Sequence, residues 1–348
     1  MNEKSMTQNT KNVTTVPEEN DPITRKSFYK KLISKWLSIL IPLALGAYLI
    51  LDTYYKFTPE QLANIKSCFG RANYLYIFIS LVISTLGGAS RAYRWKFSLE
   101  HMGYKTSFAN NFMAVSVGYF MNMTIPRSGE FSRALILKKY DDVPFDKGFG
   151  TIVAERIVDS VILLLLIIVT FFLQFKVVKS FILDKISLEQ TLWILAIGTL
   201  LSISALLVYY YSKIGIVLTI KEKISGLKEG LFSIAKLENK WPFIFHTVFI
   251  WFSYVLMFYV TIFTFEETST ISFGAVLTSF IVGSIAIAVT SSGFGTYPVL
   301  MAKILIFYGV AATAGTAFGW IVWTSQILLV TVTGLISFLF LPILNKKK

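Results

Sequence analysis

Long apolar stretches alternate with short polar ones along almost the whole chain. The apolar stretches lie at roughly 36–55, 74–90, 108–125, 150–173, 191–211, 243–265, 271–290, 297–314 and 316–342. Most of them approach the ~20 residues that an α-helix needs to cross the hydrocarbon core of a bilayer. The pattern predicts an all-α polytopic membrane protein with six to eight transmembrane helices.

Basic residues predict how these segments are oriented. Both ends of the membrane region are basic: Arg25, Lys26, Lys30, Lys31 and Lys35 precede it, and Lys346, Lys347 and Lys348 follow it. Positive charge marks the cytoplasmic side, so we expect both termini in the cytoplasm. Nine crossings would separate the termini, and therefore one segment should not cross.

The segment 108–125 is the best candidate for a segment that enters and leaves on the same side. Basic residues stand on both sides of it: Arg91, Arg94, Lys96 and Lys105 before, and Arg127, Arg133, Lys138, Lys139 and Lys147 after. We interpret them as cytoplasmic loop charges. The segment is then a re-entrant hairpin built from a broken helix.

An internal repeat supports this topology. A shift of about 165 residues places Phe108 on Phe273 and Gly118 on Gly283, and it aligns the two polar breaks at 126–130 and 291–295. The halves would be residues 36–173 and 191–342. An odd number of crossings in each half makes the repeat inverted, with a substrate site near the midplane between two broken helices. Whether 271–314 is a second re-entrant hairpin or two full spans stays open.

The remaining segments complete the domain organisation. Residues 1–24 are polar and predict a disordered cytoplasmic tail before a membrane domain at 25–342. Between the halves, residues 213–240 carry apolar side chains on one helical face: Ile220, Ile224, Leu227, Leu231 and Ile234. This connector is either an amphipathic helix at the membrane interface or a solvated linker helix.

Composition excludes several classes of function. The net charge of +13 comes from basic residues that flank apolar spans, so we expect no nucleic-acid partner. The single Cys68 excludes an intramolecular disulfide and a cysteine-based metal cluster. No phosphate-binding loop for ATP is present, and we expect no metal and no cofactor. The predicted location is the cytoplasmic membrane.

Charged residues around the first break are the candidate binding groups. Glu130 and Arg133 share a face of a helix that begins near Gly129, and Arg127 stands just before it. Pro126 and Gly129 break the helix, and free N–H groups at a helix start suit an anion such as a phosphate. Arginine forms two parallel hydrogen bonds with a phosphate. The alternative is an ordinary solvated loop at the membrane surface.

A second charged group begins the next apolar segment. Glu155 and Asp159 share one helical face, with Arg156 turned away from them. Charges at such depth must pair or line a wet cavity. Arg156 could pair with Asp159 or with Glu130, and either pair could be a structural clasp with or without a functional role.

These motifs resemble one family when they are taken in order. Arg94-Trp95 with Gly103, then Pro126-Arg-x-Gly-Glu-x-x-Arg133, then Glu155-Arg156-x-x-Asp159, and finally Ser292-Gly-Phe-Gly295 are similar to the motifs of the flippase-like family, also called the lysylphosphatidylglycerol synthase transmembrane region. The resemblance covers roughly residues 30–342. It implies a protein that moves phospholipids or related lipids between leaflets, with Ser292, Gly293 and Gly295 added to the site. The last motif departs from the family, which has Pro-rich forms there, because proline is displaced to Pro298.

We therefore expect a lipid translocator that is not an enzyme and that binds a lipid with an anionic head group. The chain ends soon after its last span, so we expect a stand-alone member without a soluble aminoacyl-transfer domain. One alternative is an intramembrane lipid-modifying enzyme, such as a prenyl transferase, suggested weakly by Asp141, Asp142 and Asp146. The other is a non-transporting partner of an envelope enzyme. A second copy of the chain or an envelope lipid-synthesis enzyme are the protein partners left open.

Overall fold

The computed structural model describes residues 47–175 apart from 126, residues 236–346 apart from 291, and a few isolated positions outside these ranges. The regular elements in this part are all helices: α2 (Pro59–Arg71), α3 (Tyr74–His101), α4 (Phe108–Thr124), α5 (Ser128–Tyr140), α6 (Phe145–Leu173), α10 (Lys240–Thr261), η1 (Ile262–Thr264), α11 (Glu266–Ser269), α12 (Phe273–Val289), α13 (Thr296–Phe307) and α14 (Ala312–Leu344). By length and composition, α3, α6, α10 with η1, and α14 could each cross a membrane. The prediction of an all-α polytopic membrane protein is confirmed.

Several predicted segments lie outside the described residues. They are the tail at 1–24, most of the span at 36–55, nearly all of the span at 191–211 and of the connector at 213–240, and Pro126. What the sequence predicts for them stays a prediction.

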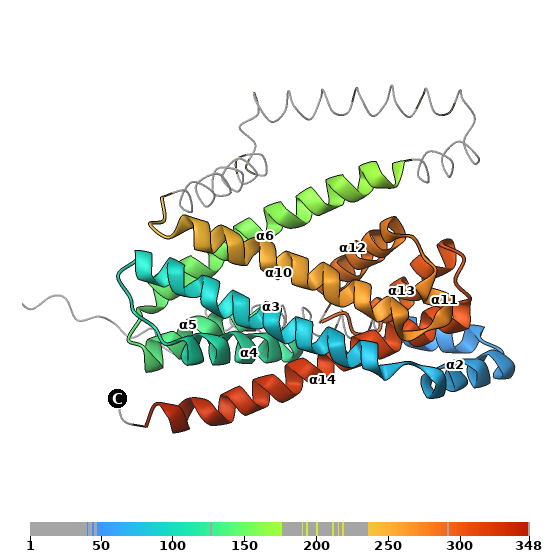
Figure 1. The fold of residues 1–348 in the computed structure, drawn as a ribbon, viewed down its shortest axis with the longest axis horizontal. Helices are drawn as coiled ribbons and strands as arrows, with labels where there is room; N and C mark the ends of the chain where they lie inside the picture. Colours follow the sequence, from blue (N-terminus) through green and yellow to red (C-terminus); the bar gives the residue numbers. More distant parts are fainter. Residues whose placement is uncertain are drawn as a thin grey trace, which may run out of the picture.

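The centre of the fold is the antiparallel pair α3 and α10 (Figure 1). The Asn73 backbone N–H donates to the Thr264 carbonyl at one end, over 2.9 Å, while Arg94 donates to Thr247 near the other end, over 3.1 Å. Between these ends, Gly87 packs against Ser253. The 165-residue shift superimposes these two helices, and a two-fold axis perpendicular to equivalent helices makes them antiparallel. The pair thus has the arrangement that an inverted repeat requires.

Two helical hairpins flank this pair at its opposite ends (Figure 1). The first is α4–α5 and the second is α12–α13, and each turns back on itself after a first helix of 17 residues. A helix of that length spans only about 25 Å, less than the ~30 Å hydrocarbon core. Both hairpins therefore have the dimensions of re-entrant segments. The side from which each would enter a membrane stays a prediction.

Equivalent serine caps start both hairpins. The side chain of Ser107 accepts a hydrogen bond from the Asn110 N–H over 3.1 Å, and that of Ser272 accepts one from the Ala275 N–H over 3.3 Å. Such caps satisfy backbone donors that the first turn of a helix leaves free. The two caps are 165 residues apart, so the internal repeat includes the hydrogen bonds that cap its helices.

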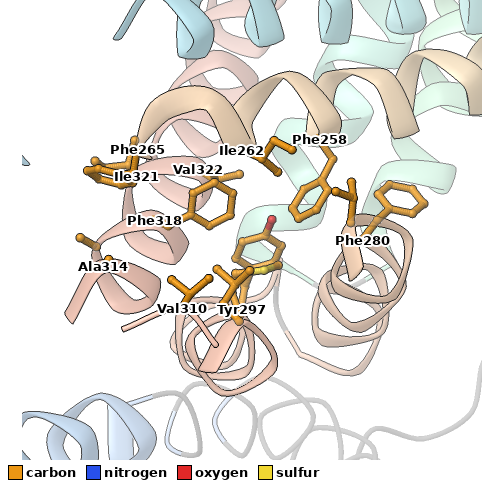
Figure 2. Close-up of a cluster of buried hydrophobic side chains, with 14 of the residues drawn as sticks. Phe258, Ile262, Phe265, Phe280, Tyr297, Val310, Ala314, Phe318, Ile321 and Val322 are labelled. Carbon is orange, nitrogen blue, oxygen red and sulfur yellow. The ribbon is translucent and has the colours of Figure 1, made fainter. Parts of the chain in front are cut away.

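Each hairpin has its own apolar core. In the first half, Trp95, Leu99, Leu137 and Ile152 are buried together between α3, α4, α5 and α6. In the second half, a larger cluster joins α10, α12, α13 and α14 (Figure 2). Side chains on the outer faces of α6 and α14, by contrast, are largely exposed leucine and phenylalanine. Those faces suit contact with lipid tails, since a soluble protein rarely exposes such wide apolar areas.

Close packing of α14 on the second hairpin depends on Gly315 and Gly319. These residues form a G-x-x-x-G pair, and a Cβ at Gly319 would lie 2.8 Å from the Cα of Pro298. Small residues at this spacing let two backbones approach closely, which drives helix association in membranes.

One part of the topology argument is wrong. Arg91, Arg94 and Lys96 are not loop residues, because α3 continues to His101, and Arg133 lies inside α5. Arg91, Arg94 and Arg133 are moreover buried. The basic residues that remain outside the packed interior around the first hairpin are Lys96, Lys105, Arg127, Lys138, Lys139 and Lys147.

Candidate functional site

The breaks of both hairpins open into one cavity of about 1100 Å³. Its lining comes from α3, α4, α5, α6, α10, α12, α13 and α14. At the first break the lining includes Arg127 and Glu130, and at the second it includes Thr290, Ser292 and Tyr297. The cavity therefore lies where the sequence places the site, between two broken helices.

Glycine makes the first break possible. A Cβ at Gly129 would overlap the carbonyl oxygen of Gly118, so the two helices of the hairpin touch through their backbones. The Gly129 N–H donates to the side chain of Asn122 over 2.8 Å, which satisfies a donor at the start of α5. Just before it, Arg127 has a φ of 64° in the left-handed region, an uncommon conformation for a residue with a Cβ. This turn places the exposed Arg127 side chain at the cavity.

An ion pair lines the cavity next to this turn. Arg156 of α6 forms an ion pair with Glu130 of α5, with 3.0 Å between Nη2 and Oε1. Of the two side chains, that of Arg156 is 39% exposed and that of Glu130 is 21% exposed. The sequence left two partners open for Arg156, and the structure selects Glu130. Both groups are within reach of a molecule in the cavity.

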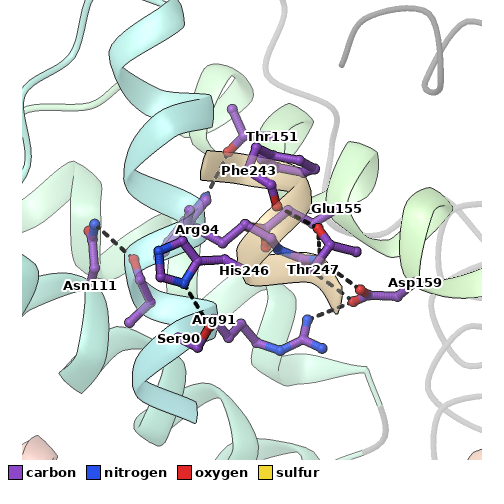
Figure 3. Close-up of polar contacts among 12 residues, drawn as sticks. Ser90, Arg91, Arg94, Asn111, Thr151, Glu155, Asp159, Phe243, His246 and Thr247 are labelled. Carbon is purple, nitrogen blue, oxygen red and sulfur yellow. Dashed lines mark hydrogen bonds and ion pairs between the residues drawn. The ribbon is translucent and has the colours of Figure 1, made fainter. Parts of the chain in front are cut away.

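A buried ionic cluster lies behind the cavity wall (Figure 3). Asp159 accepts hydrogen bonds from Arg91 over 2.7 Å and from Arg94 over 2.9 Å. Glu155 accepts one from Arg133 over 3.1 Å. The Arg133 guanidinium also lies 4.0 Å from the ring centroid of Trp95, a cation–π contact. These contacts tie α3, α5 and α6 together.

The buried cluster has an excess of positive charge. It combines three arginines with two carboxylates, and all five side chains are at most 9% exposed. Buried ions of this kind are strongly destabilising when one partner is removed. The intact cluster is therefore needed for the stability of the fold.

Two tyrosines connect the cluster to the cavity. Arg91 donates to the Tyr254 hydroxyl over 3.3 Å, and the hydroxyls of Tyr254 and Tyr119 are 3.2 Å apart. Both tyrosines line the cavity. A chain of hydrogen bonds thus connects Arg91 of the cluster to the cavity wall.

The predicted site residues fall into three groups. Four of them line the cavity: Arg127, Glu130, Arg156 and Ser292. Three belong to the buried cluster: Arg133, Glu155 and Asp159. The other two, Gly293 and Gly295, have left-handed φ values of 77° and 68° and shape the second turn.

Arg133 needs a correction. The expectation that it grips a lipid phosphate does not fit this geometry, because its side chain is 3% exposed and is held by Glu155. The same reasoning removes Glu155 and Asp159 from direct contact with a substrate. Arg127 and Arg156 are the arginines that face the cavity.

Sequence reasoning missed Arg91 as a site residue, along with Tyr119 and Tyr254. Arg91 and Arg94 are three residues apart and could have been placed on one face of a continued helix. Their signal was hidden because the apolar run stops at residue 90 while the helix does not.

The second break is closed without ionised groups. The indole N–H of Trp323 donates to the Ser292 carbonyl over 2.8 Å, and the hydroxyls of Thr290 and Thr296 are 2.7 Å apart. Ser292 has a left-handed φ of 52°, as its equivalent Arg127 does. The second end of the cavity is therefore polar but uncharged.

Of the acidic residues that suggested an enzyme, Asp141 is held by a neighbouring helix. The Asp141 carboxylate accepts hydrogen bonds from the Asn110 side chain over 2.9 and 3.0 Å. Among the residues that the structure describes, no group of three His, Cys, Asp or Glu side chains is placed to hold a metal ion.

Comparison with known proteins adds a family match. The family model described as "Lysylphosphatidylglycerol synthase TM region" matches residues 37–334. The chain is also similar to the UPF0104 membrane protein MJ1595 of Methanocaldococcus jannaschii, with 30% identity over 203 residues. That alignment covers 56% of this chain and 54% of the relative, so the chain spans about half the length of the curated relative it matches. No solved structure matches the chain.

Proposed function

Because this chain belongs to the lysylphosphatidylglycerol synthase TM region family, we propose that it is a multi-pass lipid translocator of the cytoplasmic membrane. It moves a phospholipid or related anionic lipid between leaflets and leaves the lipid chemically unchanged. The observation that carries this proposal is the cavity between the two hairpin breaks, with arginine at one end and uncharged groups at the other.

The size and lining of the cavity suit the polar part of a lipid. Its volume of about 1100 Å³ slightly exceeds the ~300–1,000 Å³ typical of pockets for small ligands. The charged end presents Arg127 and Arg156, and the other walls are largely apolar, with Ile287, Val289 and Ile327 among them. A phosphate at the arginines would leave acyl chains against the apolar walls.

Arginine rather than lysine at these positions favours a phosphate. The guanidinium group stays charged when it loses water and offers two parallel donors to phosphate oxygens. Arg127 is held at the cavity by its left-handed backbone, and Arg156 by α6. Arg127 immediately precedes α5 and Arg156 lies in α6, so a head group that binds both would also bridge the start of α5 and α6.

The test is a leaflet assay in proteoliposomes. Fluorescent phosphatidylglycerol in the inner leaflet should become accessible to an added quencher faster than in empty liposomes. Arg156→Gln should slow this roughly tenfold or more, since a charge-assisted hydrogen bond contributes about 1.5–3 kcal/mol. Arg127→Lys should slow lipid movement less, because lysine keeps the positive charge and loses only the second parallel hydrogen bond to the phosphate.

Lys138→Gln is the matched control, because Lys138 is exposed on α5 away from the cavity. It should move lipid at the wild-type rate, with circular dichroism confirming that every variant is folded. A wild-type protein that moves lipid no faster than empty liposomes would overturn the proposed function. A product of altered chemistry would instead favour the lipid-modifying enzyme.

A further inference from the structure

The described lining of the cavity contains a single carboxylate, that of Glu130. Its ionisable lining in the described residues consists of Glu130, Arg127, Arg156, Tyr119, Tyr254 and Tyr297. Arginine remains charged and tyrosine remains neutral throughout the physiological pH range. Glu130 is therefore the proton acceptor that this lining offers.

The Glu130 carboxylate is positioned to exchange partners. Its Oε1 is paired with Arg156, while its Oε2 is buried and has no hydrogen-bond partner among the described residues. Arg156 also has a buried Nε without a partner there. The two residues are thus joined by one ion-pair contact, which lies at the cavity surface.

A bound phosphate and an ionised Glu130 compete for the same arginine. Two anions that share one site repel each other, and such a pair favours protonation of the carboxylate. The other charged groups near Glu130 do not relieve this repulsion. On its own helix, Arg133 is already held by Glu155 of α6, and Arg127 faces the cavity where the phosphate would bind. The groups contributed to the lining by α4, α10 and α13 are the neutral tyrosines.

We propose that an anionic head group and a proton bind the cavity together, with the phosphate taking Arg156 and the proton taking Glu130. The proton comes from a hydronium ion or protonated buffer of the bulk solvent and forms an O–H bond on the released carboxylate. This inference rests on the proposed function, and it makes lipid movement responsive to a proton gradient.

Charge balance explains why such coupling would help a translocator. The lining carries two arginines and one carboxylate, a net charge of one positive. Binding one monoanionic phosphate together with one proton leaves that charge unchanged. The empty and loaded cavities would then meet the same electrostatic cost when the surrounding helices rearrange in a medium of low dielectric constant.

Calorimetry tests the coupling directly. Dihexanoyl-phosphatidylglycerol would be titrated into the detergent-purified protein at pH 7 in two buffers that differ in ionisation enthalpy. The difference in heat gives the number of protons taken up per lipid, and the expected value for the wild type is about one. Glu130→Gln should bind lipid with an uptake near zero.

Two further variants keep the test decisive. Glu130→Asp retains a carboxylate and should restore uptake, which guards against a folding defect of the glutamine variant. Asp146→Asn removes an exposed carboxylate at the start of α6 and should behave as the wild type does. In proteoliposomes, a pH gradient should change the rate of lipid movement for the wild type and not for Glu130→Gln.

The outcomes separate the two proposals. Lipid binding by the wild type without proton uptake, or uptake that persists in Glu130→Gln, would overturn the coupling and leave the translocator intact. A wild-type protein that neither binds nor moves the lipid would overturn the proposed function, and the coupling with it.

Discussion

The two hairpins have the same backbone plan and different chemistry. Their first helices have the same length, begin after equivalent serine caps and are followed by a left-handed residue, Arg127 in one and Ser292 in the other. Beyond that point the first hairpin has Glu130 and Arg133, where the second has Gly295 and Pro298. The second break is closed by Trp323 and two threonines instead.

This difference shows which side chains a broken helix needs in order to fold and which it does not need. A broken helix inside the protein needs partners for its free backbone groups, and uncharged groups supply them at the second break. Charge is thus not required to build such a hairpin. The ionised groups of the first hairpin need another explanation, and the cavity that Arg127 and Glu130 line provides one.

The largest effect should come from the acidic residue that holds the buried cluster. Asp159 and Gln326 occupy the same position counted from the start of α6 and of α14. Asp159→Ala leaves Arg91 without its carboxylate and leaves Arg94 only the longer ion pair with Glu155, at 3.7 Å, so it should lower the free energy of unfolding by about 3–5 kcal/mol. Gln326→Ala loses one hydrogen bond with Ser84 and should cost about 0.5–1.5 kcal/mol. Denaturant titration in detergent would compare them, and equal losses would mean that Asp159 adds no more stability than one ordinary hydrogen bond.

A slightly smaller effect is expected from the backbone contact inside the first hairpin. Gly129→Ala would push a methyl group into the Gly118 carbonyl and should cost about 3 kcal/mol. Gly148→Ala is the control, because a Cβ there would make only ordinary contacts of at least 3.6 Å. The yield of monodisperse protein would measure both. Equal yields would show that the hairpin can open without loss.

A substitution at the second break should lower the free energy of unfolding less than those at the first. Trp323→Phe removes the donor to the Ser292 carbonyl and should lower the free energy of unfolding by about 1 kcal/mol. Trp241→Phe, at an exposed position, should change it by less than about 0.5 kcal/mol. A loss as large as that of Asp159→Ala would mean that both breaks depend equally on their polar partners.

The smallest effect on stability is expected from an ion pair that joins the two halves of the chain. It lies at the end of the molecule far from the charged hairpin. Arg71 of α2 and Glu267 of α11 form an ion pair of 2.5 Å. Partial burial acts to raise the pKa of Glu267, but the hydrogen bond from its own backbone and the pair with Arg71 outweigh it, so the pKa is lowered. The stability from this pair is therefore present above the unfolded pKa of about 4.3 and is lost as pH falls through the folded pKa.

Glu267→Gln should accordingly lower the free energy of unfolding by about 0.2–1 kcal/mol at pH 7. At pH 3 the variant and the wild type should differ much less. Melting curves at both pH values would measure this, and an equal loss at each pH would assign the effect to packing and not to charge.

The sequence predicts most of the fold because apolar length and helix breaks are local properties. The predicted segment 108–125 agrees with α4 to one residue, since a serine cap begins it and a polar break ends it. The start of α6 was placed five residues late, because charged and glycine residues open this helix before its apolar run.

The site is less predictable because burial of a charge depends on partners from distant segments. Arg127 and Arg133 are six residues apart, yet one faces the cavity and the other is enclosed. Glu155, which encloses Arg133, comes from another helix, and no local pattern reveals that contact. The arginines of α3 were assigned to a loop for the same reason, since their partner Asp159 is more than sixty residues away.

The position of Cys68 has a practical consequence for chemical labelling. It is the only cysteine in the sequence, and it is 1% exposed between α2 and the core of the second half. A folded protein should therefore react slowly with maleimides, and cysteines introduced at Lys105 or Lys139 would report their own side of the membrane without removal of the native thiol. Reaction of Cys68 itself would signal that α2 has come away from the bundle.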